Sequence, residues 1–445
     1  MKKLLLTNGR IVNERNIVET DVLIVGDRIE RIGAGPVPAD AETLDLAGQY
    51  VLPGLIDDQV HLREPGLTHK ATIASESRAA ICGGVTSYLD MPNNAPPATD
   101  RAAVASKKEI AARSSYANYG FYLGATNTNL EEIRRATVAD ACGIKVFMGA
   151  STGNMLVDDE ATLHAIFADA RLPIATHCED TPMIKAAEKQ AFADYGEDVP
   201  IAEHARIRSA EACWKSSSLA VSLAQQHGTR LHILHLSTAR ELELFEPGPI
   251  DAKRITAEVC VHHLWFDQSD YAELGTRIKC NPAIKTAEDR IGLLAGVNAD
   301  IIDVIATDHA PHTLDEKRRK YFEAPAGLPL VQHSLLMLLE QHRRGAFSLE
   351  TIVQKTAHNP ATLFGIEARG FIREGYFADM VVVNLDGQTT VTSEQVQYKC
   401  GWSPLEGQTL RGSVQTTILN GRVVFDHGNV VEQPAGRQLE FSASY

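Results

Sequence analysis

The chain has 445 residues, a formal net charge of -14 and a sequence pI near 5.6. This acidic balance argues against nucleic acid or an anionic membrane as the main partner, because both require basic patches. The seven cysteines include no Cys-x-x-Cys pair, which argues against a disulfide framework and a thiolate zinc site. No apolar run is long enough to span a bilayer. We therefore expect a cytoplasmic protein that acts on a small molecule, with room for a large α/β barrel and a smaller domain.

Both ends of the chain show the pattern of short β-strands. Residues 1–50 contain apolar segments separated by turn signals such as Asn8-Gly9. The same pattern returns near the C-terminus, where Asn420-Gly421 repeats the Asn8-Gly9 signal in nearly identical surroundings. We predict one small β-sandwich built from residues 1–52 and 368–445, in which these two signals form hairpin turns.

Between the two ends, over residues 53–367, apolar strand candidates alternate with helical patterns. The strand candidates are Val51–Ile56, Val85–Asp90, Tyr119–Ala125, Gly143–Met148, Pro173–His177, Leu231–His235, Ile255–Val259 and Val304–Thr307. Helical patterns cover Asp100–Arg113, Leu130–Arg135, Asp159–Ala170, Ala202–Gln226 and Ala287–Asn298. This alternation is typical of βαβ units around a parallel sheet, and eight strands predict a TIM-like (β/α)8 barrel.

Several polar side chains fall where the predicted strands end, which is where barrel enzymes carry their catalytic groups. His61 follows the first strand, His177 and His235 end the fifth and sixth, and Asp308 follows the eighth. Any one of these histidines, taken alone, is more often structural. Together, three histidines and one aspartate form a mixed N/O set that suits zinc or a similar divalent ion with an open position for water.

Lys145 lies in the otherwise apolar fourth strand, where an unpaired ammonium group is costly to bury. One interpretation is a lysine that extends to solvent or pairs with an acid. The functional interpretation is that CO2 converts the amine to a carbamate, an anion that bridges two metal ions. The spacing of the sequence does not distinguish the two.

Three further features are weaker signals. His262 and His263 follow the seventh strand, and we expect adjacent strand residues to point to opposite faces, so that at least one is structural. Cys178 and Cys280 lie beside site candidates and are interpreted as packing residues. The charged loop of residues 314–329 follows the eighth strand and ends in a Gly-Leu-Pro segment whose backbone can face a substrate.

These motifs together resemble those of the class I-type dihydroorotases, in the cyclic amidohydrolase superfamily, over almost the whole chain. The matching segments are 57–66, 90–94, Lys145, 176–179, 235–237, 281–282 and 307–312. The resemblance implies a barrel with a terminal β-sandwich and one or two zinc ions. It further implies that His61 binds the first metal, that a carboxylated Lys145 bridges, that His177 and His235 bind the second, and that Asp308 touches metal and transfers the proton.

The resemblance also implies a substrate with a carboxylate, held by Arg63, Asn93 and His312, while Asn281 contacts the pyrimidine ring. A guanidinium offers a planar fork suited to a carboxylate. The alternatives are an ion pair between Arg63 and its neighbour Glu64, and a helix-capping role for Asn93. Hydantoinases and allantoinases share the metal pattern, so a related cyclic amide hydrolase is the competing function.

Two departures from the family pattern remain. Gln59 stands where the first histidine of a His-x-His pair is expected, and an amide oxygen is a weak zinc ligand, so the first metal should bind less tightly or be absent. The segment Asn281–Lys285 lacks a second proline and an arginine, which leaves its ring contacts open. A catalytically impaired scaffold homologue is therefore a further alternative. We expect a homodimer.

Overall fold

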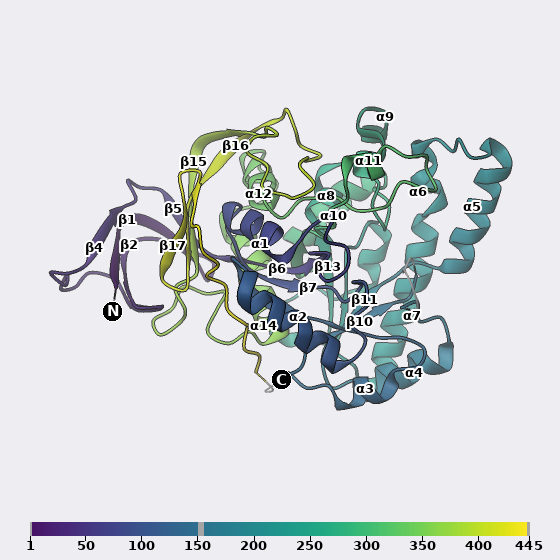
Figure 1. Cartoon of the computed structure of the whole chain (residues 1–445), viewed down its shortest axis with the longest axis horizontal. Coiled ribbons are helices and arrows are strands. Elements are labelled where there is room, and N and C mark those ends of the chain that lie inside the picture. The colour runs from purple at the N-terminus through teal and green to yellow at the C-terminus, as the bar shows by residue number, and fades with distance from the viewer. Residues whose placement is uncertain (1, 150–154, 443–445) are drawn as a thin grey trace.

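The computed structural model describes residues 2–149 and 155–442. The chain forms a β-sandwich from its two ends and a (β/α)8 barrel between them. In Figure 1 the purple N-terminal strands and the yellow C-terminal strands lie side by side, and the helices of the barrel occupy the other end of the molecule. Both predicted units are thus confirmed.

The strands of the sandwich come from both ends of the chain. They are β1 (Lys3–Asn13), β2 (Asn16–Val25), β3 (Arg28–Ile32), β4 (Glu42–Asp45), β5 (Tyr50–Pro53), β15 (Met380–Thr390), β16 (Thr409–Leu419), β17 (Arg422–Asp426) and β18 (Asn429–Val430). They pair in the order β18-β17-β16-β15-β5-β1-β2-β3, with β4 beside β1. β5 joins the two ends, because Val51 pairs with Ile11 on one side and with Val382 on the other.

The predicted turn at Asn8-Gly9 is wrong. β1 runs continuously through it, with a bulge between Leu6 and Gly9 that shifts the register against β2. Asn8 takes a left-handed φ of 55°, which a bulge accommodates as readily as a turn does. The copy at Asn420-Gly421 does form the predicted hairpin turn, between β16 and β17.

The barrel strands all pair in parallel. They are β6 (Leu55–Val60), β7 (Val85–Asp90), β8 (Asn118–Phe121), β9 (Leu123–Gly124), β10 (Ile144–Phe147), β11 (Ile174–His177), β12 (Leu231–Ile233), β13 (Ile255–Cys260) and β14 (Val304–Ala306). The predicted third strand is divided into β8 and β9 at Tyr122, whose hydroxyl donates to the Asp58 carbonyl at 3.0 Å. The barrel closes where the His61 amide donates to the His309 carbonyl at 2.7 Å.

The predicted first strand, Val51–Ile56, is divided between the two units at Gly54, so that β5 belongs to the sandwich and β6 to the barrel. A Cβ atom on Gly54 would lie 2.2 Å from Thr86 Oγ1 on β7. Only glycine therefore allows the chain to cross this closely from one unit to the other.

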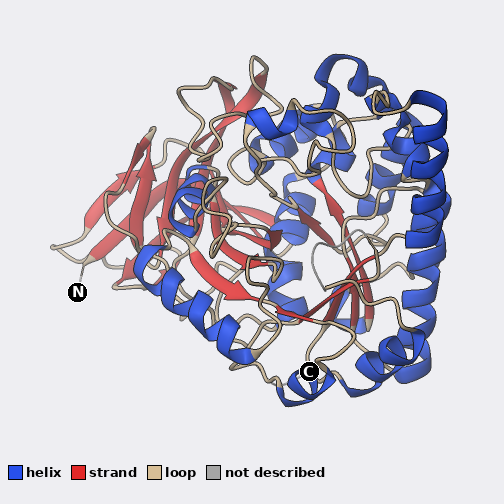
Figure 2. Cartoon of the chain, turned by 45° about the vertical axis from the view of Figure 1, so that its right-hand side comes forward, coloured by secondary structure: helices blue, strands red, loops and turns tan. Residues whose placement is uncertain are grey.

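Helices surround the barrel strands on the outside (Figure 2). They are α1 (Ile73–Cys82), α2 (Arg101–Ser114), α3 (Leu130–Arg135), α4 (Glu160–Asp169), α5 (Thr181–Tyr195), α6 (His204–Ile207), α7 (Ala210–His227), α8 (Val261–Trp265), α9 (Tyr271–Leu274), α10 (Ala287–Asn298), α11 (Leu314–Lys317), α12 (Ser334–Arg343), α13 (Leu349–Val353) and α14 (Asn359–Phe364). The single helix predicted over 202–226 is two helices, because Ser209 caps the N-terminus of α7 with its side chain.

Candidate active site

A cavity of about 90 Å³ lies at the C-terminal ends of the barrel strands. Its lining contains Gln59, His61, Arg63, Lys145, Phe147, His177, His235, Asn281, Asp308, Ala310, Ala326 and Gly327. These residues follow or end β6, β10, β11, β12 and β14, or lie in the loops after β13 and β14. The fold thus brings together the five residues predicted to hold metal and two of those predicted to hold substrate.

His177 and His235 point their ring nitrogens at the same place. His177 Nδ1 and His235 Nε2 are 3.0 Å apart, and the rings are perpendicular with centroids 4.7 Å apart. Burial lowers the pKa of both imidazoles, so both are neutral near pH 7 and carry a lone pair. Two neutral nitrogens converging in this way are suited to share one metal ion.

Glu179 orients His177 from behind, and sequence reasoning did not assign it a role. Its Oε2 lies 2.9 Å from His177 Nε2 and accepts from Arg208 Nη1 at 2.6 Å. Burial opposes ionisation of Glu179, but Arg208 and His177 hold its pKa well below the ordinary value. An ionised partner fixes the Nε2–H tautomer and leaves His177 Nδ1 free for a metal.

Asp308 and His61 form the other half of the site. His61 Nε2 lies 2.9 Å from Asp308 Oδ1, and His61 Nδ1 lies 2.6 Å from Asn93 Oδ1. Burial would raise the pKa of Asp308, but the hydrogen bond from His61 lowers it below its ordinary value. Asp308 is therefore a carboxylate. Its φ of 46° turns the chain sharply at the strand end, a strained geometry typical of functional sites.

Asn93 reaches the site through His61 and does not line the cavity. The capping alternative is wrong, because Asp100 caps α2 by accepting from the Ala103 amide at 2.7 Å. In this structure Asn93 orients an imidazole. Its predicted contact with substrate stays a prediction.

Gln59 occupies the position of the missing histidine and is 1% exposed. Its Nε2 donates to Asp308 Oδ1 at 3.2 Å, and its Oε1 lies 3.8 Å from Cys260 Sγ. The carboxamide therefore meets Asp308 as a donor, whereas a metal ligand must present a lone pair. This contact favours a weakened first metal position.

Lys145 is 1% exposed, and no hydrogen bond or ion pair to its Nζ is found within the described residues. The ammonium lies 4.6 Å from the centroid of the Phe147 ring. Burial lowers the pKa of Lys145 to about 8, so about a tenth of the amine is uncharged at pH 7. An uncharged buried amine is the form that reacts with CO2.

Arg63 lines the cavity and has no acidic partner in the described part of the chain. Nε donates to the Pro311 carbonyl at 3.1 Å, and Nη2 lies 3.0 Å from His312 Nε2. Glu64 instead accepts from the Ile73 amide at 2.9 Å, so the predicted alternative of an Arg63–Glu64 pair is wrong. Burial lowers the pKa of Arg63 to about 10, which leaves it charged.

His312 is held beside Arg63 by three other contacts. Lys70 Nζ lies 2.9 Å from His312 Nδ1, His312 Nε2 lies 3.0 Å from the Ala326 carbonyl oxygen, and the Trp402 indole donates to the His312 carbonyl at 2.8 Å. Burial lowers the pKa of His312 well below its ordinary value, and the neighbouring cations Arg63, Lys317 and Lys70 lower it further. His312 is therefore neutral.

Two buried lysines fix the loop that closes one side of the cavity. Lys317 Nζ donates to the carbonyls of Lys279, Pro325 and Gly327 at 2.9 to 3.0 Å. Lys279 Nζ donates to the Tyr321 and Ala324 carbonyls. Ala326 and Gly327 are thereby presented to the cavity, as the loop prediction for 314–329 expected. The sequence did not indicate that two buried lysines hold this loop.

Asn281 lines the cavity, and its Oδ1 is buried without a hydrogen-bond partner among the described residues. Such an atom loses its hydration on folding, so an amide or ring N–H from a ligand would restore a bond. This position is consistent with a ring contact.

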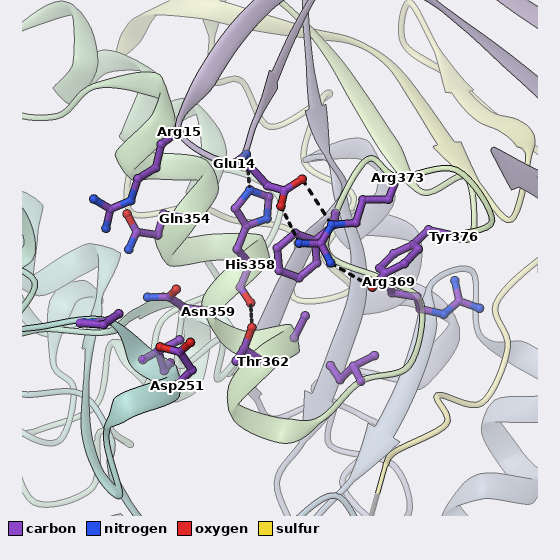
Figure 3. Close-up of a pocket in the computed structure, with 15 residues that line it drawn as sticks. Glu14, Arg15, Asp251, Gln354, His358, Asn359, Thr362, Arg369, Arg373 and Tyr376 are labelled. Atoms are coloured by element: carbon purple, nitrogen blue, oxygen red, sulfur yellow. Dashed lines mark hydrogen bonds and ion pairs between the residues drawn. The ribbon is translucent and has the colours of Figure 1, made fainter. Parts of the chain in front are cut away.

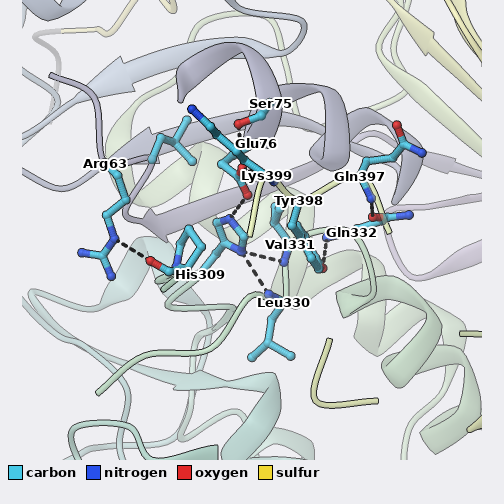
Figure 4. Close-up of polar contacts among 12 residues, drawn as sticks. Arg63, Ser75, Glu76, His309, Leu330, Val331, Gln332, Gln397, Tyr398 and Lys399 are labelled. Carbon is cyan, nitrogen blue, oxygen red and sulfur yellow. Dashed lines mark hydrogen bonds and ion pairs between the residues drawn. The ribbon is translucent and has the colours of Figure 1, made fainter. Parts of the chain in front are cut away.

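His309, His262 and His263 do not line the cavity. His309 Nε2 lies 2.8 Å from Glu76 Oε2, and the Leu330 amide donates to its Nδ1 at 3.0 Å, so the ring anchors the strand-end turn (Figure 4). His262 and His263 lie in the short helix α8, because β13 ends at Cys260. The prediction that they sit on a strand is wrong, and both are buried.

A larger cavity, of about 560 Å³, lies near the opposite ends of the strands, beside the loop before β13 (Figure 3). Two of its charged groups pair with each other, because Arg373 lies 2.5 Å from Glu14, and the Glu14 amide donates to His358 Nε2 at 2.9 Å. The His358 ring stacks on Phe371. These contacts indicate a rigid packing region and no second reaction centre.

The profile of the amidohydrolase family matches residues 50–424. The chain belongs to the amidohydrolase family. It is a metal-dependent cyclic amidohydrolase, as the sequence indicated. Within the described part of this amidohydrolase, no helix is both long and apolar enough to cross a membrane.

Relatives of this amidohydrolase carry several activities. It is 35% identical over 411 residues to a dihydroorotase of Methanothermobacter thermautotrophicus, covering 91% of this chain and 90% of the relative. It is 32% identical over 458 residues to an allantoinase of Solibacter usitatus, covering 100% and 98%. The solved L-hydantoinase from Arthrobacter aurescens superposes with a TM-score of 0.93 at 29% identity, covering 99% and 100%. Overall similarity therefore does not select the substrate.

The Glu179–His177 contact yields a prediction. Glu179→Gln keeps the shape of the side chain but removes its charge, so the His177 ring loses its fixed tautomer. We expect the affinity for metal to fall about 10- to 100-fold, measured by competition with a chromogenic chelator. Glu203→Gln, on an exposed pair with Arg206, is the matched control and should leave the affinity unchanged. Unchanged affinity in Glu179→Gln would show that this carboxylate does not orient a ligand.

Proposed function

We propose that this amidohydrolase is a dihydroorotase, which closes N-carbamoyl-L-aspartate to (S)-dihydroorotate and catalyses the reverse hydrolysis, in pyrimidine biosynthesis. The observation that carries the proposal is Arg63. It is a buried cation that lines the cavity, and no hydrogen bond to its Nη1 occurs within residues 2–149 and 155–442. A charge buried without a counterion is costly, so the missing partner is expected from the ligand.

The surroundings of Arg63 favour an anion over a neutral ring. Lys70 Nζ lies 2.9 Å from His312 Nδ1 and pairs with Glu316 at 3.1 Å, so Arg63 is the member of this basic group that lines the cavity. Dihydroorotate carries a carboxylate that can pair with Arg63, whereas hydantoin and allantoin have no carboxylate. A guanidinium with one free edge binds such a group in a fixed orientation.

The donors present fit a zinc ion. His177 Nδ1 and His235 Nε2 would hold it, with a carboxylated Lys145 as a third ligand. On the opposite side His61 and Asp308 offer one nitrogen and one oxygen, and Gln59 adds only an amide. We infer that one ion is held firmly and that a second, between His61 and Asp308, is weak.

When bound, the metal supplies an activated water and polarises the ring carbonyl. Asp308, ionised in this structure, accepts the proton of the attacking water and returns it to the ring nitrogen as the C–N bond breaks. His61 keeps the Asp308 carboxylate in place. Arg63 and His312 hold the substrate carboxylate, and the Ala326–Gly327 backbone closes over the ring, so the reacting carbonyl is fixed relative to Asp308.

A hydantoinase or allantoinase activity is the second candidate, favoured by the TM-score of 0.93 to the L-hydantoinase and the full-length match to an allantoinase. Neither hydantoin nor allantoin carries a carboxylate that would neutralise the charge of Arg63. The scaffold alternative is less favoured, because His61, Lys145, His177, His235 and Asp308 all face one cavity.

Replacement of Arg63 tests the substrate assignment. Arg63→Met preserves length and apolar contact but removes the guanidinium. We expect the KM for carbamoyl aspartate to rise about 10- to 100-fold, since hydrogen bonds to charged groups contribute roughly 1.5 to 3 kcal/mol, with a smaller change in kcat. Arg134→Met, in an exposed pair with Asp169, is the control. An unchanged KM would remove Arg63 from the substrate site and leave the neutral-ring hydrolases as the better assignment.

Replacement of Gln59 tests the metal assignment. Gln59→His adds an imidazole beside Asp308 and His61, completing a His-x-His pair. We expect the metal content of dialysed protein to rise from about one to about two equivalents, measured by plasma mass spectrometry. Two equivalents that EDTA removes from the unchanged protein would contradict the inference that Gln59 weakens the first position.

A further inference from the structure

His204, at the start of the helical turn α6, is a buried side chain to which no role has yet been assigned. It is 0% exposed, and both of its ring nitrogens form hydrogen bonds. Nε2 lies 2.8 Å from the Cys280 carbonyl oxygen, and Nδ1 lies 2.8 Å from the Tyr321 hydroxyl. Cys280 precedes Asn281, and Tyr321 belongs to the loop of residues 314–329. His204 therefore joins two segments that both contribute to the cavity lining.

The two hydrogen bonds of His204 have fixed directions. A carbonyl oxygen only accepts, so His204 Nε2 carries the proton and donates it to Cys280. Burial lowers the pKa of His204 well below its ordinary value, and the Arg208 cation lowers it further, so the ring is neutral near pH 7. The lone pair is then on Nδ1, which accepts from the Tyr321 hydroxyl. A single tautomer thus satisfies both partners.

The segment that carries Asn281 is held at its other end as well. The Tyr271 hydroxyl accepts from the Ile284 amide at 3.2 Å, three residues after Asn281. The Tyr271 ring is perpendicular to the His204 ring, with centroids 6.1 Å apart. The Tyr321 ring also packs edge-on against His204, with centroids 5.6 Å apart. The three rings therefore pack as one group beside the segment that carries Asn281.

The same helical turn also contacts the side of the cavity that holds the metal-ligand candidates. Arg208 follows α6, and its amide donates to the His204 carbonyl at 2.9 Å. Its Nη1 donates to Glu179 Oε2 at 2.6 Å, and Glu179 in turn contacts His177. This one turn of helix therefore connects the position of His177 with that of Asn281.

We propose that His204 is a positioning residue of this amidohydrolase. Through its two hydrogen bonds it holds Asn281 and the loop of residues 314–329 in a fixed place relative to His177. The contacts of Asn281 and of this loop with a substrate ring belong to the proposed function, so this inference rests on that function. His204 does not line the cavity and acts through the two segments that do.

Replacement of His204 should affect the chemical step more than the affinity. Arg63 still holds the substrate carboxylate in such a variant, whereas the reacting carbonyl is no longer fixed relative to Asp308. Small errors in position slow a reaction by as much as about 100-fold. We expect kcat to fall about 10- to 100-fold in His204→Leu and about 10-fold in Tyr321→Phe, with KM within about threefold of wild type.

Steady-state hydrolysis of dihydroorotate by the full-length, metal-loaded protein gives both constants. Tyr116→Phe and His164→Leu are matched controls, since Tyr116 donates to the Glu432 carbonyl and His164 contacts His227, away from the cavity lining. His204→Gln keeps one N–H donor and one oxygen acceptor, so kcat should return to within about threefold of wild type. A role in stability alone would lower Tm but leave the kcat of folded, metal-loaded protein unchanged.

A second measurement does not depend on turnover. Trypsin cleaves after Arg318, Arg319 and Lys320, which are exposed on the loop that Tyr321 anchors. We expect this cleavage to be about 10-fold faster in His204→Leu and Tyr321→Phe than in the control variants, because the loop opens more often without its hydrogen bond. The metal content, measured by plasma mass spectrometry, should not change.

A kcat equal to that of wild type in both His204→Leu and Tyr321→Phe would overturn the proposal. A fall in kcat that follows a loss of metal would overturn it as well, since it would assign the effect to Arg208 and Glu179. If His204→Leu does not fold, Tyr321→Phe, which lacks a single oxygen atom, decides. Wild-type protein that opens hydantoin or allantoin but not dihydroorotate would contradict the proposed function, and the same comparison of kcat/KM on that ring would still test His204.

Discussion

The structure depends on charged groups that the fold buries at one end of the barrel without giving them counterions. Arg63 is held by a carbonyl and a neutral imidazole, and Lys317 by three carbonyls. In the described residues neither group has an acid within ion-pair distance. Burial lowers the pKa of Lys317 well below its ordinary value, whereas Arg63 keeps its charge, so the missing counterion of Arg63 favours the anionic ligand that we propose.

At the same end of the barrel, two neighbouring groups of side chains differ in their charge. One side presents neutral imidazoles, His177 and His235, backed by the ionised Glu179. The other presents Asp308, kept ionised by His61. Gln59 donates a hydrogen bond to Asp308. It is the one side chain that replaces a ligand expected in a site for two metal ions. The proton-transfer role that we propose for Asp308 does not require the second ion.

Much of this arrangement could be predicted from the sequence, because strand periodicity and strand ends are local properties. The positions of His61, His177, His235 and Asp308 followed from where apolar runs stop. Glu179 could have been found in the same way, since it lies two residues after His177 and alternation places the two on one side.

Other features depend on contacts between distant segments and could not be predicted. Lys317 donates hydrogen bonds to carbonyls near residue 326, and these contacts form only after the loop has folded over the barrel. Asn8-Gly9 carries a turn signal, yet a bulge uses the same left-handed backbone, and pairing with β2 decides between them. The length of β13 decided that His262 lies in a helix. The substrate that we propose likewise rests on the environment of Arg63, which the overall identity to relatives does not reveal.

The most direct test of the central claim is a comparison of dihydroorotate with dihydrouracil, two rings that differ by the carboxylate alone. Steady-state hydrolysis of both by the purified, metal-loaded protein gives the ratio of their kcat/KM values. The account predicts a preference for dihydroorotate of about 10³-fold or more, since a site built around a charged group rejects the analogue that lacks it. Equal turnover of the two rings, or a preference for dihydrouracil, would contradict it.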